Sequence, residues 1–585
     1  MMAGGTTGIA DNRLTVFVAI LAFIAWVLTY GGYFPNPEGR LGHDYERYLA
    51  QLLDGTFWVR VNGYFEIPWF TPSFCAGLPK FGHPNGIYVS LPQWLTLLVG
   101  PLLAVKLTVI GAAAAGYAGM WLLLRRAFGV EPVMALTGAV LFLWNGFYVH
   151  RMLVGHLTFH AYMLLPLQAY LLHALAEPGA PVARRAAFAA GLALTAAYQF
   201  TSGMVHLVGP VALALVGIVC LLARDEPRRL MQMILWGIGC AALALALVAA
   251  PLTATLAFLS HFNRDLYTLP GFTDPLAHVW TGLSVLFGRA DAATVQALLA
   301  NRALPVEIQE LEYGLSPVPV VLMLAGLAGA GLPRMRGRSL AIVGCALVLL
   351  VPFALNQYGA GWNAWLKSLP LFASSSNLLR WYAAWIPLVI VLSILLLRRV
   401  PRARHPALPL AATLFVMVFQ TQTADPLYAQ QRYDPGPVEH AWATVTRPEI
   451  TEVHPVRDLT AGASQAYCRD DFFGYRMETF PFRQMWEGAP TLEREGVFNM
   501  KHPACYGYPA ENACTPGDNF RLGDSADLKA FVRYAPIGFE VNAWQRLANV
   551  LSMLGLVSVG GVLVIAGIGT LRARTVSNGQ ERGDA

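Results

Sequence analysis

Two carboxylates, Asp44 and Glu46, stand one residue apart in the stretch GHDYERYLAQLLDG. A carboxylate held firmly where water meets lipid could take a proton from a hydroxyl group as a general base. Two carboxylates this close could also share a divalent cation such as Mg²⁺ or Mn²⁺. A structural role is the third interpretation, because aspartate is favoured at the N-terminus of a helix. The residues alone leave these alternatives open.

A second group of candidates is basic and lies in the stretch WNGFYVHRMLVGHLTFHAY, which carries His150, Arg151, His156 and His160. Positive charge beside a membrane is costly unless an anion is near, so this cluster could bind a phosphate. His156 and His160 are four residues apart and could share a zinc ion, but no third ligand stands beside them. Ordinary interfacial histidines are the remaining alternative.

Further candidates lie in other segments predicted to face the outside. Arg380, in LPLFASSSNLLRWYAAW, could bind a phosphate through its planar fork or anchor a helix at the headgroups. Lys80 and His83 are the cationic candidates of a proline-rich stretch, and Glu312 is a possible second acid. The other carboxylates near Glu312 are expected to form a solvated surface: Asp265, Asp274, Asp291, Glu307 and Glu310.

The elements that must position these residues follow from composition. Hydrophobic residues make up 56% of the 585 residues and charged residues 13%, whereas a soluble domain has about 25% charged residues. This excludes a soluble enzyme, a secreted disulfide scaffold and a disordered chain. Segments of about 20 apolar residues predict an all-α polytopic membrane protein. Twelve spans are predicted, at 14–33, 102–124, 132–148, 158–176, 186–201, 203–222, 232–259, 316–332, 339–355, 380–398, 407–423 and 543–571.

Arginines in the short loops set the predicted orientation, because positively charged loops stay in the cytoplasm. Both termini are then cytoplasmic, and the first span is expected to be retained, since no signal-peptidase motif follows it. The long polar segments all face outward, at 34–101, 260–315, 356–379 and 424–542. The apolar spacing after Asp44 predicts a helix lying on the outer membrane surface. Function is therefore expected on the outer side, at the periplasmic face of a bacterial inner membrane.

Three parts are predicted along the chain. Residues 1–423 form the membrane module, 424–542 a soluble periplasmic domain of mixed α/β or β-rich structure, and 543–585 the last span and a cytoplasmic tail. Outer cysteines in an oxidising compartment favour disulfides, and Cys505–Cys514 is the nearest pair. Cys75 and Cys468 are the other outer cysteines, so three connectivities are possible.

Several of these stretches resemble the GT-C superfamily of membrane glycosyltransferases, which includes protein mannosyltransferases and the aminoarabinose transferase of lipid A. The matching stretches are GHDYERYLAQLLDG, GLPKFGHPNGIYVSLPQ, GHLTFHAYMLLPL and LPLFASSSNLLRWYAAW. The resemblance implies a GT-C-like fold with Asp44 as the catalytic base. His43 precedes Asp44 where double-acid versions of the motif have a second acid, which leaves a divalent cation an open question.

The resemblance also implies the reaction: inverting transfer of a sugar from a polyprenyl-phosphate donor to a lipid, glycan or protein acceptor. Arg380, Arg151 and His156 would bind the donor phosphate, with Lys80 and His83 as further candidates. A transporter or flippase of lipid-linked glycan is the main alternative, and a non-catalytic polysaccharide-assembly protein is another. Transporters commonly show repeated halves and charges at mid-membrane, neither of which is seen in the predicted spans.

Overall fold

The computed structural model describes most of the chain. The described residues are 5–35, 40–42, 44–71, 78–223, 226–258, 268–288, 291–301, 306, 308–330, 339–373, 375–401, 405–423, 431–432, 435–446, 497–515, 518–521, 524–532 and 534–583.

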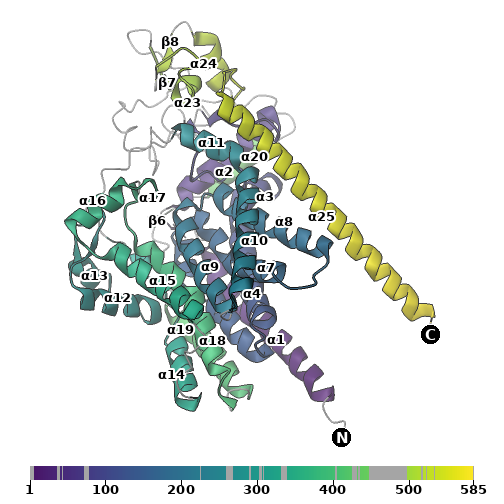
Figure 1. The fold of residues 1–585 in the computed structure, drawn as a ribbon. Helices are drawn as coiled ribbons and strands as arrows, with labels where there is room; N and C mark the ends of the chain where they lie inside the picture. Colours follow the sequence, from purple (N-terminus) through teal and green to yellow (C-terminus); the bar gives the residue numbers. More distant parts are fainter. Residues whose placement is uncertain are drawn as a thin grey trace.

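Helices dominate this structure (Figure 1). Those of the first half are α1 (Gly5–Tyr30), η1 (Gly31–Tyr33), α2 (Tyr45–Asn62), α3 (Leu91–Val99), α4 (Pro101–Leu122), η2 (Leu123–Ala127), α5 (Pro132–Leu143), α6 (Gly146–Leu153), η3 (Leu157–Leu164), α7 (Leu165–Leu175), α8 (Val182–Thr201), η4 (Val205–Leu207), α9 (Val208–Ala223), α10 (Pro227–Leu247), α11 (Ala249–Phe258) and α12 (Pro275–Phe287). Those of the second half are α13 (Ala292–Leu298), η6 (Ile308–Glu310), α14 (Val318–Ala330), α15 (Ser339–Asn356), α16 (Ala360–Ser368), α17 (Pro370–Ala373), η7 (Leu379–Ala384), α18 (Trp385–Leu397), α19 (Ala407–Thr423), α20 (Gly436–Val445), α23 (Pro503–Gly507), α24 (Ser525–Val532) and α25 (Ala543–Gly583).

Within the described residues, eight helical stretches are long and apolar enough to cross a membrane, as expected of a polytopic membrane protein. They are Arg13–Tyr33, Pro101–Ala127, Pro132–Leu153, Val205–Ala223, Pro227–Leu247, Ser339–Asn356, Leu379–Leu397 and Ala543–Gly567. The predicted spans 316–332 and 407–423 correspond to shorter apolar helices. Residues 158–176 divide into η3 and α7. A proline lies in the first turn of α7, where it is tolerated because the backbone N–H groups of that turn have no partner within the helix. Twelve spans therefore stay a prediction.

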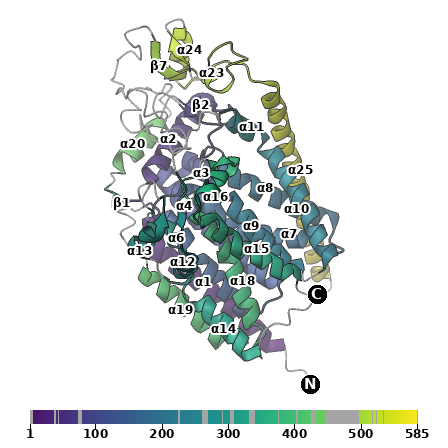
Figure 2. The ribbon, with the colours of Figure 1, turned by 60° about the vertical axis from the view of Figure 1, so that its left-hand side comes forward.

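The bundle is centred on the stretch that contains α5 and α6. The apolar window of Pro132–Leu153 is 89% buried, whereas that of Ala543–Gly567, within the long α25, is 17% buried and leaves its apolar side chains on the surface. Gly138 of α5 lies close to η2, since a Cβ at that position would lie 2.4 Å from a methyl group of Leu124. The two chain ends lie at the same end of the bundle (Figures 1 and 2).

The opposite end carries α2, α11, α20, α23 and α24 (Figure 1). In the described part of the chain, four two-stranded antiparallel sheets lie in the segments between the helices: β1 (Arg40–Leu41) with β6 (Gln431–Arg432), β2 (Phe70–Thr71) with β3 (Leu78–Pro79), β4 (Gly271–Phe272) with β5 (Leu299–Ala300), and β7 (Val497–Lys501) with β8 (Asn519–Arg521). The predicted position of α2 on the outer membrane surface stays a prediction, but the helix is not an isolated one. Most of its residues are buried, and it packs against α3 and α20.

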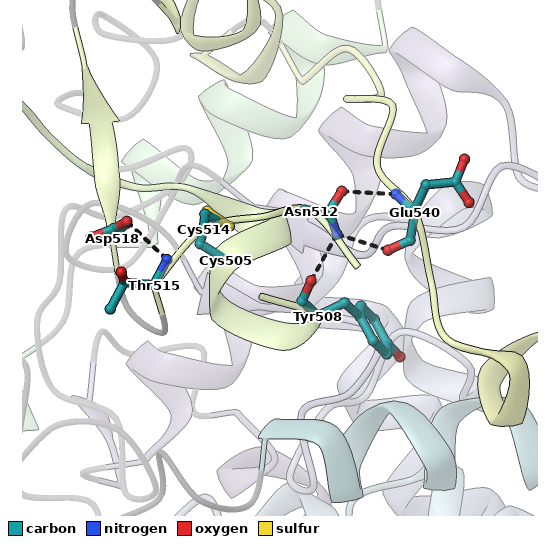
Figure 3. The surroundings of a disulfide bond; sticks show 7 residues. All are labelled: Cys505, Tyr508, Asn512, Cys514, Thr515, Asp518 and Glu540. Atoms are coloured by element: carbon teal, nitrogen blue, oxygen red, sulfur yellow. Dashed lines mark hydrogen bonds between the residues drawn. A yellow bond between two sulfur atoms is a disulfide. The ribbon is translucent and has the colours of Figure 1, made fainter. Parts of the chain in front are cut away.

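A disulfide joins Cys505 to Cys514 beside the start of α25 (Figure 3). The Tyr508 hydroxyl, between the two cysteines, donates to the side chain of Gln545 at 2.7 Å, and Asn512 bonds the backbone of Glu540. The loop closed by the disulfide is thereby attached to the last span. Cys75, Cys468 and much of 424–542 lie outside the described residues, so the separate soluble domain stays a prediction.

Candidate functional site

The backbone around Asp44 is held against the turn that follows α6. The Asp44 N–H donates to the carbonyl of Val154 at 3.1 Å, and the Tyr45 hydroxyl donates to that of Met152 at 2.5 Å. Gly155 permits this approach, because it has a φ of +93° and a Cβ there would lie 2.5 Å from the Tyr45 nitrogen. The start of α2 is therefore positioned by a segment more than 100 residues further along the chain.

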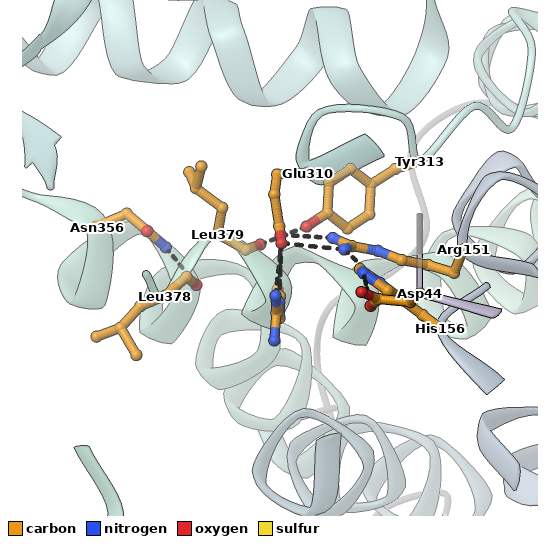
Figure 4. A network of polar contacts seen from close by, with 9 residues as sticks. Asp44, Arg151, His156, Glu310, Tyr313, Asn356, Leu378 and Leu379 are labelled. Carbon is orange, nitrogen blue, oxygen red and sulfur yellow. Dashed lines mark hydrogen bonds and ion pairs between the residues drawn. The ribbon is translucent and has the colours of Figure 1, made fainter. Parts of the chain in front are cut away.

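The Asp44 side chain does not cap α2. It makes no hydrogen bond to the first backbone N–H groups of the helix, so the capping interpretation is wrong. Its Oδ2 instead lies 3.0 Å from Nε2 of His156, and the Asp44 side chain is 27% exposed (Figure 4). This carboxylate is thus fixed from one side by a histidine and still reaches the molecular surface.

His156 is held in one protonation state by its second neighbour. An Arg151 Nη1 lies 3.0 Å from His156 Nδ1, and a guanidinium can only donate, so Nδ1 must accept. The proton is then on Nε2 and is donated to Asp44. Burial lowers the pKa of His156; Asp44 opposes this shift, and the positive charges of Arg151 and Arg380 add to it. His156 is therefore a neutral donor to Asp44 in this structure, and its binding of a donor phosphate stays a prediction.

Glu310, at the end of η6, lies between two arginines, of which Figure 4 labels Arg151. Arg151 binds it through both terminal nitrogens at 3.0 and 2.5 Å, and Arg380 at the start of η7 binds it at 2.6 Å. Burial alone would raise the pKa of the Glu310 carboxyl, but the two guanidinium charges outweigh burial and hold that pKa well below its usual range. The prediction of a solvated surface is wrong for Glu310. Two cations and one anion leave this cluster with one positive charge.

Aromatic rings complete the cluster. The Arg151 guanidinium lies 5.5 Å from the ring centres of Phe147 and Phe159, and that of Arg380 lies 5.4 Å from the ring of Phe159. Such contacts stabilise a desolvated cation. The Arg151 side chain is fully buried, whereas the Arg380 side chain is 20% exposed. Of the two arginines predicted to bind phosphate, Arg380 is the one that a ligand can contact, and Arg151 supports it from behind.

Other candidates from the sequence have different neighbours. Glu312 is buried and lies 3.8 Å from His150, while Glu46 lies half-buried on the first turn of α2. His160 donates to the Leu157 carbonyl and accepts from the Tyr198 hydroxyl, a pairing different from that of His156. The two histidines do not converge on a common zinc site.

Lys80 and His83 lie apart from Arg380. Lys80 forms a buried ion pair with Asp54, ten residues after Asp44 on α2 and about 15 Å further along the helix axis. Burial lowers the pKa of Lys80, and the Asp54 charge partly offsets that shift. The His83 Nδ1 accepts the backbone N–H of Asn85 at 3.0 Å. These two side chains form a second polar group and do not join the cluster around Glu310.

A divalent cation has no evident ligand set in the described part of the chain. No three side chains of His, Cys, Asp or Glu in that part lie together as a metal site. The Glu310 oxygens are bonded to guanidinium groups, and His43 lies outside the described residues. The described residues therefore do not fit the Mg²⁺ or Mn²⁺ that the sequence left open.

Comparisons with known proteins give similarity at the level of structure. No protein-family model and no curated protein matches the chain. The structure is similar to the oligosaccharyltransferase of Archaeoglobus fulgidus in its apo form, with a TM-score of 0.39 and 14% identity over 78% of this chain and 60% of that chain. It is also similar to the oligosaccharyltransferase AglB of that organism in complex with an inhibitory peptide and a dolichol-phosphate, with a TM-score of 0.40 and 12% identity over 79% and 60% of the two chains.

Both solved structures are of oligosaccharyltransferases. The chain spans about 60% of the length of these structures. A likeness at this identity and TM-score assigns no residue and no activity to this chain.

Proposed function

We propose that this chain is a membrane glycosyltransferase that moves a sugar from a polyprenyl-phosphate donor to an acceptor at the outer face of the membrane. The observation that carries the proposal is the arrangement of Asp44, which is partly exposed, is fixed by neutral His156 and lies next to the Arg151–Glu310–Arg380 cluster, which carries one positive charge. A base for the acceptor and a cation for the leaving phosphate are what glycosyl transfer from a phosphate requires.

Asp44 would act as the general base. As the acceptor oxygen attacks the anomeric carbon, its proton passes to the Asp44 carboxylate, and the bond between that carbon and the phosphate oxygen breaks with inversion. The electrons of that bond leave with the phosphate. His156 supports the step because its Nε2–H bond favours the ionised form of Asp44 and holds it in one orientation. A base placed in this way contributes about 10²–10⁴-fold to the rate.

Arg380 would bind the donor phosphate. The leaving phosphate gains negative charge in the transition state, so a cation already in place stabilises that state more than the ground state. Glu310 bonds Arg380 through both Nε and Nη2, at 3.1 and 2.6 Å, and so fixes the plane of its guanidinium. Arg151 supplies the second positive charge, so the two arginines together exceed the single negative charge of Glu310. The proposal routes no step through a metal ion.

The reaction can be tested with purified protein in liposomes, using polyprenyl-phosphate monosaccharides labelled in the sugar and a membrane extract as the source of acceptor. The proposal predicts that free polyprenyl phosphate and labelled product appear together. A flippase would move the donor across the bilayer and leave it intact. An assembly protein would do neither. Intact donor after incubation with every sugar of the panel would contradict the proposal.

A further inference from the structure

A small half-open cavity of about 30 Å³ lies beside α2, away from Asp44. Its polar lining comes from Gln51 and Asp54 of α2, from Thr71 of β2, and from Lys80, His83 and Tyr88. A second, smaller cavity borders the same Lys80, His83 and Tyr88. The proposed transfer reaction uses none of these side chains.

The charges in this cavity are balanced. The Asp54 and Lys80 side chains are 1% and 9% exposed and pair directly, and the Thr71 hydroxyl donates to Asp54 at 2.5 Å. The Lys80 ammonium also lies 5.5 Å from the ring centre of Tyr88. Because the carboxylate neutralises the ammonium, a phosphate would meet a buried negative charge here. A neutral ligand that both donates and accepts hydrogen bonds fits better.

Tyr88 supplies the observation that points to a ligand. Tyr88 is among the residues that line both cavities and is 7% exposed, yet its buried hydroxyl has no hydrogen-bond partner among the described residues. Buried hydroxyls in folded proteins nearly always have a partner. Burial raises the pKa of Tyr88, so the phenol stays neutral and can donate or accept.

We propose that this cavity is a subsite for a neutral sugar unit, which inserts one edge of its ring and bonds Tyr88 and the Asp54–Lys80 pair through its hydroxyl groups. The assignment of that unit to the acceptor rests on the proposed function. The cavity has room for hydroxyl groups but not for a whole ring, so the ring itself stays at the mouth. Asp54 lies about 15 Å from Asp44 along α2, so the bound unit belongs to an acceptor longer than one monosaccharide.

Saturation-transfer NMR on the full-length protein in nanodiscs tests the subsite, with methyl glycosides and disaccharides of mannose, glucose and galactose as probes. At least one probe should bind the wild type, and Tyr88→Phe should weaken it at least fivefold, because the variant loses only the hydroxyl. Tyr64→Phe is the matched control: Tyr64 stacks on Tyr88 at 6.1 Å, but its hydroxyl accepts from Trp94 and does not line the cavity. That control should bind like the wild type.

The outcomes separate the subsite from the proposed reaction. Asp44→Asn should bind the same probe unchanged, and it should do so even if the wild type proves to transfer no sugar. The subsite is overturned if no probe binds, if Tyr88→Phe binds as well as the wild type, or if inorganic phosphate displaces the sugar. The last result would show an anion site.

Discussion

His156 donates its Nε2 proton to the carboxylate of Asp44 across 3.0 Å. The two residues are 112 positions apart, and the contact depends on the turn after α6 that also accepts the Asp44 backbone N–H. Arg151 donates to the opposite ring nitrogen, so His156 links the partly exposed acid to the buried Arg151–Glu310–Arg380 cluster.

Replacement of His156 should show whether its hydrogen bonds position Asp44. A glutamine can still donate to Asp44 through its amide nitrogen and accept from Arg151 through its oxygen, whereas alanine can do neither. We expect His156→Ala to lower kcat about 10²-fold through misplacement of Asp44, and His156→Gln to recover most of the loss. Transfer kinetics under donor saturation measure this. Equal loss in both variants would show that the two hydrogen bonds do not position Asp44.

Stability should depend on pH through His156. Its pKa is lowered in the folded protein, so below the ordinary histidine pKa of about 6.5 the unfolded chain binds more protons, and the folded state loses stability as pH falls. The Tm advantage of the wild type over His156→Gln should therefore shrink between pH 7.5 and pH 5. Thermal unfolding in detergent at several pH values measures it. An advantage that stays constant or grows would contradict a neutral His156.

Loss of Glu310 should be severe. Glu310→Ala leaves the buried Arg151 and the partly exposed Arg380 without their anion, and removal of one partner of a buried ion pair costs about 3–5 kcal/mol. Glu540→Ala removes an ion pair with Arg546, in which both side chains are mostly exposed, and should cost less than about 1 kcal/mol. Denaturant unfolding in micelles compares them. Similar costs for the two variants would argue against a buried cluster.

Gly155→Ala should damage the site through the backbone of Asp44. The new Cβ would lie 2.5 Å from the Tyr45 nitrogen, and the φ of +93° adds strain. Gly179→Ala is the control, since Gly179 has a φ of +74° but no atom within 4 Å of the added Cβ. Both variants should lose about 1–2 kcal/mol to strain, and Gly155→Ala alone should lose transfer activity, by about 10²-fold. Comparable activity in both would show that this contact does not position Asp44.

Much of the fold could be predicted from the sequence, because lipid exposure demands long apolar helices. The eight stretches found by length and composition all correspond to predicted spans. Segment 158–176 was less predictable. Its hydropathy is that of a span, but it opens as the 3₁₀ helix η3, whose His160 and Tyr162 bond to distant elements. Hydropathy does not report such tertiary hydrogen bonds.

The charged residues of the candidate site could be predicted from the sequence, but the ion pairs that they form could not. Asp44, Arg151 and Arg380 were candidates because a charged side chain beside a membrane is costly unless it has a partner or a function. Glu310 did not, since its stretch EIQELEYG has the composition of a solvated surface. Its partners are 159 and 70 residues away, and nothing local distinguishes it from Glu312, two positions on. The usable signal for Glu310 was the presence of arginines that need an anionic partner when they are buried.

The most direct test of the central claim compares Asp44→Asn with Asp291→Asn in the sugar-transfer assay. The Asp291→Asn variant should keep the cap of α13, since asparagine caps helices as well as aspartate does, so it removes an exposed carboxylate whose side chain bonds Thr294 of its own helix. The account predicts that Asp44→Asn loses at least about 10²-fold in kcat while Asp291→Asn transfers sugar like the wild type. Full transfer by Asp44→Asn would contradict it.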